Sequence, residues 1–190
     1  IDVSLVGSEM CIRDSINAGS TSGIITIGNI VDDSLDEVDE TIIVTLSTPS
    51  NATLGNNNVH TYVINDNENA PSIGFNLISS SNDESVASQS IDVNLSSVSS
   101  KNITVNYSAT GTATGSGTDY NLANGTLTIS PGGVTGTITI TDIVDDSLDE
   151  ANETVIITLS SPTNASLGTD IVHTYTINDN DNAPAIGFNI

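Results

Sequence analysis

The feature that most constrains this chain is an internal repeat with a period of 113 residues. Residues 30–76 align with residues 143–189 without a gap, and 34 of these 47 positions are identical. The similarity extends back to residue 16, because "INAGSTSGIITI" from Ile16 lies on "ISPGGVTGTITI" from Ile129. A fixed period indicates adjacent copies of one unit. This period is too long for a solenoid and is typical of an array of sandwich-sized domains.

The complete copy of the repeat is a series of short strand patterns. Seven runs alternate apolar and polar residues between Gly, Asn, Ser and Pro, namely residues 72–78, 90–96, 102–111, 125–130, 136–144, 154–160 and 173–179. Such runs predict an antiparallel β-sandwich. No segment of useful length has a helical period. The copies are joined by "NDNENAP" and "NDNDNAP", in which proline disfavours helix and stiffens a short linker.

The charge balance excludes several kinds of partner. The chain has two basic and 24 acidic residues, a net charge of −22. Nucleic acids and anionic membrane surfaces need Lys and Arg to neutralise phosphate, so neither is expected to bind. No apolar run approaches the 18 or so residues that a membrane-spanning helix needs, so we expect no membrane insertion. An acidic surface is suited to binding cations or to remaining fully solvated.

The first 15 residues do not belong to the repeat. Residues 5–15, "LVGSEMCIRDS", have no counterpart in the second copy and hold the only Met, Cys and Arg of the chain, Met10, Cys11 and Arg13. This string resembles the read-through translation of a transposase-type sequencing adapter, a contaminant of assembled metagenomic reads. We therefore expect residues 1–15 to be non-native and the natural repeat to lack cysteine. The sequence also lacks a signal-peptide pattern at its start, and we expect it to be a piece of a larger protein.

Nothing in the sequence predicts catalysis. His60 and His173 occupy the same repeat position, and each stands alone among polar and apolar strand residues. Serine, histidine and aspartate all occur, but no nucleophile elbow does. A phosphate-binding loop must be followed by a lysine and a helix, and the glycine-rich turns of this chain are followed by neither. We therefore expect a protein that is not an enzyme.

The complete repeat resembles a Calx-beta domain. The resemblance is carried by residues 111–181, "GTATGSGTDYNLANGTLTISPGGVTGTITITDIVDDSLDEANETVIITLSSPTNASLGTDIVHTYTINDND". The landmarks of the family are present in order: G-T-A, G-x-D-Y, G-T-L, P-G, D-D, the A-x-L-G turn and a closing acidic run. The resemblance implies immunoglobulin-like sandwiches in tandem. It divides the chain into the second half of one repeat (16–70), a complete repeat (71–182) and the start of another (183–190).

The resemblance also implies a set of metal ligands. Members of the family often bind Ca²⁺ at one end of the sandwich, and their acidic positions fall here on Glu84, Asp119, Asp145, Asp146, Glu150, Asp179 and Asp181. Asp83 is an alternative to Glu84. The closing acidic run has one acidic residue fewer than in the family, because Asn180 stands between Asp179 and Asp181. The truncated repeat keeps a partial set, Asp32, Asp33, Glu37, Asp66 and Glu68, without partners of the Glu84 and Asp119 type.

The chemistry of calcium agrees with this assignment. Ca²⁺ takes six to eight oxygen ligands, so a site needs carboxylates from more than one loop. Asp119, Asp145 and Asp179 each adjoin a predicted strand, and loops distant in sequence converge at the end of a sandwich. The alternative for "DDSLDE" is a solvated acidic loop that keeps strand edges apart.

These features lead to an expected function with two rivals. We expect a calcium-binding structural or adhesive repeat of a large extracellular surface protein, whose partners are calcium ions, neighbouring repeats and a surface or matrix ligand. The first rival is a calcium-independent acidic spacer. The second is a set of accessory repeats in a secreted hydrolase whose catalytic domain lies outside this sequence.

Overall fold

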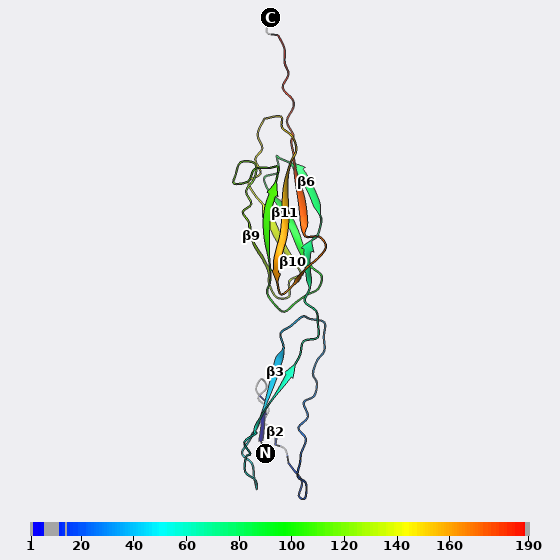
Figure 1. Ribbon diagram of the computed structural model, residues 1–190, viewed down its shortest axis with the longest axis vertical. Coiled ribbons are helices and arrows are strands. Elements are labelled where there is room, and N and C mark those ends of the chain that lie inside the picture. The colour runs from blue at the N-terminus through cyan, green and yellow to red at the C-terminus, as the bar shows by residue number, and fades with distance from the viewer. Residues whose placement is uncertain (1, 6–11, 14, 189–190) are drawn as a thin grey trace. The chain divides into compact units, whose positions relative to one another are not determined.

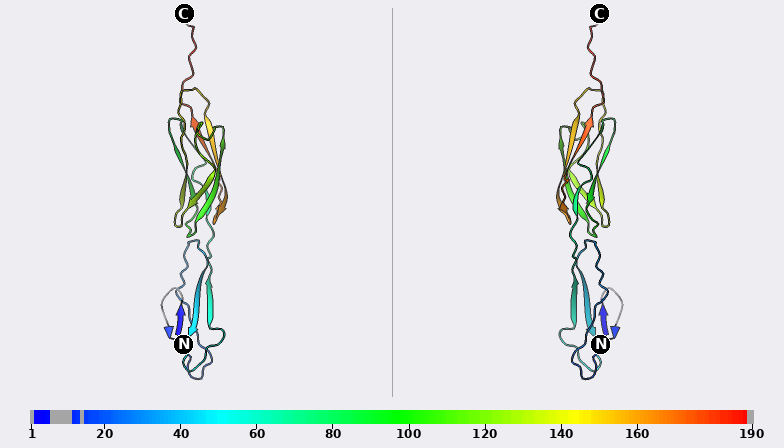
Figure 2. Two further views of the ribbon diagram at one scale, coloured as in Figure 1. Left: turned by 90° about the vertical axis from the view of Figure 1, so that its left-hand side faces the viewer. Right: turned by 90° about the vertical axis from the view of Figure 1, so that its right-hand side faces the viewer.

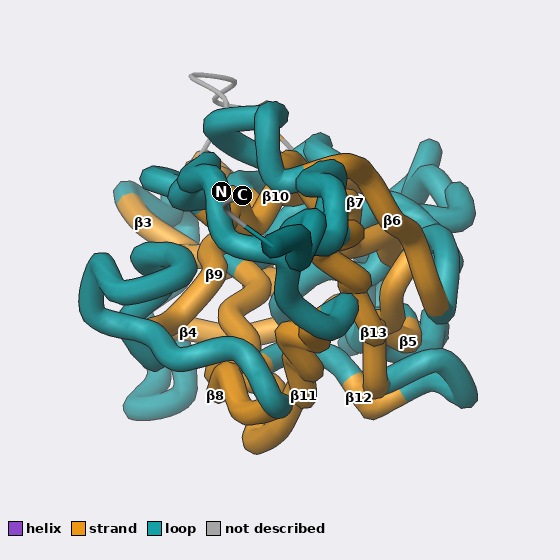
Figure 3. Tube along the Cα trace, turned by 90° about the horizontal axis from the view of Figure 1, so that it is seen from above, coloured by secondary structure: helices purple, strands orange, loops and turns teal. Residues whose placement is uncertain are grey.

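The computed structural model describes residues 2–5, 12–13 and 15–188. The chain divides into two compact units, Ile1–Glu68 (unit 1) and Asn69–Ile190 (unit 2) (Figure 1). The described residues form strands and loops and no helix (Figure 3), so none of them offers a helix that could cross a membrane. The predicted all-β class is confirmed.

Unit 2 is built from two sheets (Figures 1 and 2). One has four strands in the order β10-β7-β5-β12, and the other has five in the order β6-β13-β11-β8-β9. Their bounds are β5 Ser72–Phe75, β6 Ser79–Asp83, β7 Gln89–Leu95, β8 Ile103–Gly111, β9 Gly125–Ile129, β10 Thr135–Ile140, β11 Glu153–Thr163, β12 Ser166–Leu167 and β13 Val172–Asn178. Most neighbours are antiparallel, whereas β12 pairs with β5 and β13 pairs with β6 in parallel.

All seven predicted runs contain a strand, and the sequence pattern missed two others. β6 is "SSSND" and β12 has only two residues. Neither offers the alternation of apolar residues on which the prediction depends. β6 forms because it adds to the edge of β13 through backbone hydrogen bonds, in the register Thr174↔Ser79 to Asn178↔Asp83. The alternation within 72–78 predicts inward positions for Ile73, Phe75 and Leu77, and the last of these is wrong, because β5 ends at Phe75 and Leu77 is 62% exposed.

The core of unit 2 follows from the period-2 pattern. Inward residues of β7, β11 and β13 alternate with outward polar ones, and they pack into one cluster that includes Val93, Ile157, Leu159 and Tyr175, each no more than 1% exposed. Burying a side chain of this size stabilises the fold by about 1.5–3 kcal/mol. These apolar side chains fix the strands whose ends carry the acidic loops.

His173 belongs to this core. It is 2% exposed, one ring nitrogen (Nε2) lies 2.9 Å from Ser80 Oγ, and the other (Nδ1) lies 2.6 Å from the Leu77 carbonyl oxygen. Its ring also packs against Phe75, with 5.5 Å between centroids. Both nitrogens therefore have partners, and the histidine ties β13 to the turn between β5 and β6.

Unit 1 has the strand order β2-β1-β3-β4. Its strands are β1 Asp2–Leu5, β2 Ile12–Arg13, β3 Glu40–Ser47 and β4 Val59–Ile64. β3 and β4 correspond to β11 and β13 of unit 2 and pair in the same antiparallel way, as Ile43↔Thr61 and Ile156↔Thr174 show. β1 pairs with β3, where β8 pairs with β11 in unit 2.

The segment predicted to be non-native is described only in part. Residues 2–5 and 12–13 lie in β1 and β2, whereas Met10 and Cys11 lie outside the described residues. The foreign origin of residues 1–15 stays a prediction.

Candidate metal centre

Three carboxylates converge where β6 and β13 end. Because these strands are parallel, their carboxyl ends lie at the same edge of the sheet, with Asp83 opposite Asn178. The Glu84 backbone N–H donates to the Asn178 carbonyl oxygen at 3.0 Å. As a result, one oxygen each of Glu84, Asp179 and Asp181 lies within 4.8 Å of the other two. That spacing allows the three oxygens to share one cation with ligand distances near 2.5 Å.

This triad is unusually desolvated for a group of acids. Glu84 is 6% exposed, and burial raises the pKa of its carboxyl. The Asn180 N–H, 3.5 Å from Glu84 Oε1, lowers that pKa, while the charges of Asp179, Asp181 and Asp146 raise it. Within the described part of the chain, the buried Asp181 Oδ2 accepts no hydrogen bond. A buried carboxylate oxygen without a donor is expensive unless a cation satisfies it.

A second group of acids lies beside the triad. The pKa of the Glu153 carboxyl is raised, and burial is the largest cause. The charge and hydrogen bond of Asp119 and the charges of Glu150 and Glu84 raise it further. Asp119 is held by its own loop: its backbone N–H donates to the Thr114 carbonyl oxygen at 3.0 Å, and its carboxylate accepts the Thr114 N–H. A cation bound between these carboxyls would compensate their mutual repulsion.

The sequence analysis missed Glu153. It is the first residue of β11, one residue before the predicted strand run 154–160, and it was not among the predicted ligands. The neighbouring part of β11 lies close to Gly111, since a Cβ at that residue, where φ is +139°, would lie 2.0 Å from the Thr154 carbonyl oxygen. The available signal was an acid at the junction of the acidic loop and the strand, repeated as Glu40 in the other copy.

The exposed aspartates of the acidic loop reach the site less directly. The Asn180 side-chain amide donates to Asp145 Oδ1 at 3.3 Å, and Asp146 Oδ1 accepts the Leu148 N–H at 2.7 Å. Asp146 also contributes charge at Glu84. Asp83, the alternative to Glu84, lies outside the triad. The structure thus brings Glu84, Asp179 and Asp181 together, sets Asp119 and Glu150 around Glu153, and leaves Asp145 and Asp146 at the rim.

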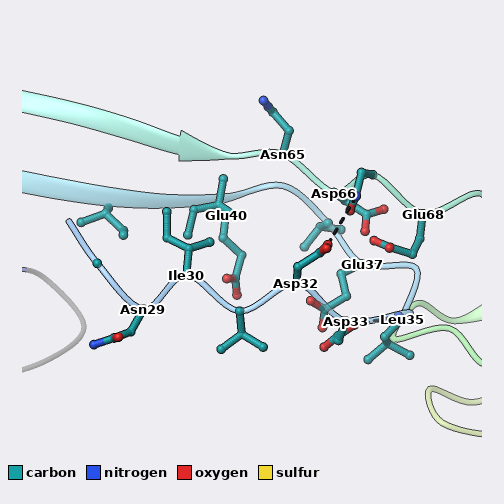
Figure 4. A pocket seen from close by; sticks show the side chains of 16 residues that line it. Asn29, Ile30, Asp32, Asp33, Leu35, Glu37, Glu40, Asn65, Asp66 and Glu68 are labelled. Atoms are coloured by element: carbon teal, nitrogen blue, oxygen red, sulfur yellow. Dashed lines mark hydrogen bonds between the residues drawn. The ribbon is translucent and has the colours of Figure 1, made fainter.

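The partial set of unit 1 has the same loop architecture. Its carboxylates line an open hollow of about 630 Å³, and Figure 4 shows those of Asp32, Asp66 and Glu68 turned toward one space. Partial burial and Asp66 raise the pKa of the Glu68 carboxyl. However, among the described residues a triad of acidic oxygens within 4.8 Å occurs only in unit 2.

Two hydrogen bonds recur at equivalent positions in the two units. The Leu35 N–H donates to Asp33 Oδ1 at 2.7 Å, as the Leu148 N–H does to Asp146 Oδ1. The Asp66 N–H donates to Asp39 Oδ1 at 3.0 Å, as the Asp179 N–H does to Asn152 Oδ1 at 3.1 Å. The loops therefore fold alike, whether or not the rest of the site is present.

Comparisons with known proteins identify the family and the fold. The sequence profile of the Calx-beta domain family matches residues 17–68 and 66–181. The chain is similar to the apo-form Calx CBD1 domain, at 26% identity and a TM-score of 0.54 over 58% of this chain and 98% of that one. It is equally similar to the calcium binding domain CBD12 of CALX1.1, at 26% identity and a TM-score of 0.54 over 59% of this chain and 47% of that one. The Calx CBD2 domain, at 16% identity and a TM-score of 0.51 over 57% of this chain and 86% of that one, supports the fold alone. No curated protein sequence matches.

Proposed function

The chain belongs to the Calx-beta domain family, and from this premise we propose that unit 2 is a calcium-binding module. Glu84, Asp179 and Asp181 would hold the ion, with Asp119, Glu150 and Glu153 as further oxygen donors beside them. Asp145 and Asp146 lie at the rim and add negative charge. The observation that carries the proposal is the buried Asp181 Oδ2, which accepts no hydrogen bond in the described structure.

The donor set suits a hard cation. Every candidate ligand is a carboxylate oxygen. Such oxygens suit hard cations such as Ca²⁺ and Mg²⁺ better than they suit soft metals. The ligands come from several loops with irregular spacing, and Ca²⁺ tolerates irregular geometry better than Mg²⁺ does. Bound calcium would supply the charge that the crowded acids lack and would stabilise the folded unit by mass action.

Thermal unfolding tests the proposal. The protein is melted in EDTA and then in calcium at a hundred times its dissociation constant, where binding adds about 2.7 kcal/mol. For a domain of this size we expect the unit 2 transition to rise by roughly 10 °C. An unchanged midpoint would favour the rival reading, a calcium-independent acidic spacer.

A matched pair of variants locates the site. Glu84→Gln removes one member of the triad, and we expect it to abolish most of the calcium-induced shift. Asp83→Asn makes the same charge change one residue away, outside the triad, and should keep the full shift. Equal losses in both variants would show that only total charge matters, and this would contradict a specific site.

The setting of the module is a further part of this proposal. We propose that the parent is an extracellular surface protein in which such repeats serve as structural or adhesive spacers. The tandem match of the family at residues 17–68 and 66–181 supports an array. Extracellular calcium modules bind at about 10⁻⁴–10⁻³ M, so a dissociation constant in that range would favour this setting. The parent gene would test the rival that these repeats accompany a secreted hydrolase.

A further inference from the structure

We propose that Asn180 is a latch, a residue whose amide groups hold Glu84 and the acidic loop (residues 144–152) beside the closing acidic run while no cation is bound. The inference rests on the calcium-binding function proposed above and deepens it, because it concerns the same site before the ion binds. Asn180 stands between Asp179 and Asp181, two members of the triad. It is thus a neutral residue with hydrogen-bond donors in a row of acceptors.

Asn180 donates to two carboxylates that belong to different parts of the site. Its backbone N–H donates to Glu84 Oε1 at 3.5 Å, and its side-chain Nδ2 donates to Asp145 Oδ1 at 3.3 Å. Glu84 is buried, whereas Asp145 is exposed in the acidic loop. Because hydrogen bonds to ionised groups are stronger than those between neutral groups, this one residue can join a buried acid and an exposed acid without a metal ion.

The ionisation of Glu84 is affected by the backbone donor of Asn180. Burial is the largest cause of the raised pKa of the Glu84 carboxyl, and the charges of three nearby aspartates raise it further, whereas the Asn180 N–H lowers it. A donor that lowers the pKa of a carboxyl stabilises the ionised form. Asn180 therefore favours the charged state that a cation needs, in a place where the neighbouring acids oppose it.

The side-chain bond of the latch reaches the acidic loop between its two anchored ends. At the start of the loop the Val144 N–H donates to the Asp119 carbonyl oxygen at 3.0 Å. At its end Asn152 Oδ1 accepts the Asp179 N–H at 3.1 Å. The residues between, 145–151, are all exposed, and four of these seven are acids. Exposed segments of this kind open at a low free-energy cost, so a bond from the closing acidic run matters most here.

An acid in place of Asn180 would have the opposite effect. An aspartate would put a carboxylate where Nδ2 now lies 3.3 Å from Asp145 Oδ1. Like charges so close repel each other, and the acidic loop would move away from the triad. The amide replaces this repulsion with an attraction, so the rim of the site is in place before an ion binds. A site that is ordered in advance loses less conformational entropy on binding.

Amide hydrogen exchange in EDTA tests the latch directly. Asn180→Ala removes the side-chain donor and keeps the backbone N–H. We expect the amides of residues 145–151 to exchange about two- to tenfold faster in this variant, the range for the loss of one hydrogen bond. Asn180→Asp also adds repulsion and should accelerate their exchange further. The amides of β7, which lies in the other sheet, should exchange as before in both variants.

Thermal unfolding separates a latch from an ordinary structural contact. In EDTA both variants should lower the midpoint of the unit 2 transition, Asn180→Asp more than Asn180→Ala. In saturating calcium both should melt close to the unchanged protein, because the ion then holds the acids together. The calcium-induced rise should therefore be larger in both variants than in the unchanged protein, and largest in Asn180→Asp. A contact with a structural role alone would lower the midpoint equally in both conditions.

The matched control is Asn102→Asp, which makes the same charge change at an exposed residue just before β8. It lies away from the site, because the other end of β8, at Gly111, pairs with Val155 beside Glu153. It should change neither the exchange of residues 145–151 nor the calcium-induced rise.

The proposal is overturned if Asn180→Ala leaves the exchange of residues 145–151 unchanged in EDTA. Where calcium stabilises the unchanged protein, equal losses of stability in EDTA and in calcium would also overturn it. The exchange measurement needs no bound ion. A protein without any calcium response would therefore refute the function proposed above, and the exchange rates would still decide whether the latch exists.

Discussion

Units 1 and 2 share a closely similar sequence over their second halves and differ in what surrounds it. In both units the acidic loop and the strand pair fold alike, down to two equivalent hydrogen bonds. In unit 2 the pair β11–β13 is sandwiched, and Tyr175 is fully buried; in unit 1 the pair β3–β4 leaves Tyr62 40% exposed. The comparison shows that local sequence specifies the loops, whereas core burial and a closed site require the strands from the first half of the repeat.

The largest expected effect tests this difference in burial. Tyr175→Ala should destabilise unit 2 by about 3–5 kcal/mol, as expected for an aromatic residue removed from a core. Tyr62→Ala, the same change at the equivalent position, should cost unit 1 less than about 1 kcal/mol because its side chain is already partly solvated. Urea unfolding followed separately for each unit measures both values. Similar losses at the two positions would mean that β4 is covered in solution.

The calcium response should separate the units next. We expect Asp145→Ala/Asp146→Ala to weaken binding and remove part of the calcium-induced rise in the unit 2 transition, because both residues add charge beside the triad. Asp32→Ala/Asp33→Ala makes the same change in unit 1 and should leave that rise intact. Calorimetric titration of both variants measures the affinity. A larger loss of affinity in the unit 1 variant would show that the main calcium site lies in unit 1, and this would contradict the proposal.

How far the sequence alone could lead is clearest at particular residues. The alternation of Ile91, Val93 and Leu95 predicted β7 directly, because one face of a strand must be apolar to be buried. β6 has no such signal; its place depends on backbone pairing with β13, which no local pattern encodes. That pairing in turn sets Glu84 beside Asp179. The family resemblance located Glu84, but only the sheet geometry distinguishes it from Asp83.

Glu153 was missed for another reason. It lies just before the predicted strand run 154–160, and the structure makes it the first residue of β11, where the charge and hydrogen bond of Asp119 act on its carboxyl. A side chain at the first residue of a strand can face either the core or a neighbouring loop. Which of the two it faces depends here on the loop that carries Asp119, more than 30 residues away in sequence.

The pH dependence should also distinguish the calcium-free from the calcium-bound protein. Burial raises the pKa of Glu84 and Glu153 above the ordinary value of 4.5. A raised carboxyl pKa in the folded state stabilises the protein below 4.5, and this stability is lost as the pH rises through the folded-state pKa. In EDTA the melting temperature of unit 2 should therefore fall as the pH rises above 4.5.

Calcium should reverse this trend, because it binds the ionised carboxylates and competes with protons. Glu84→Gln should flatten the pH profile in EDTA, whereas Asp83→Asn should leave the slope intact. If the two variants behave alike, the pH dependence reflects the overall negative charge rather than the buried site.

The smallest expected effect comes from exchanging Asp and Glu, which differ by one methylene, at the position that closes the site. Unit 2 closes its site with Asp181, and unit 1 has Glu68 at the equivalent position. In Asp181→Glu the longer side chain must move the carboxylate that lies buried against Glu84 and Asp179, so we expect calcium to bind a few-fold more weakly, since ligand placement tunes affinity. The reverse change, Glu68→Asp, should give unit 1 no calcium response, because the described part of unit 1 forms no triad of close acidic oxygens. Titration calorimetry of both variants decides the matter. A calcium response gained by Glu68→Asp would show that side-chain length, and not the missing strands, is what separates the two units.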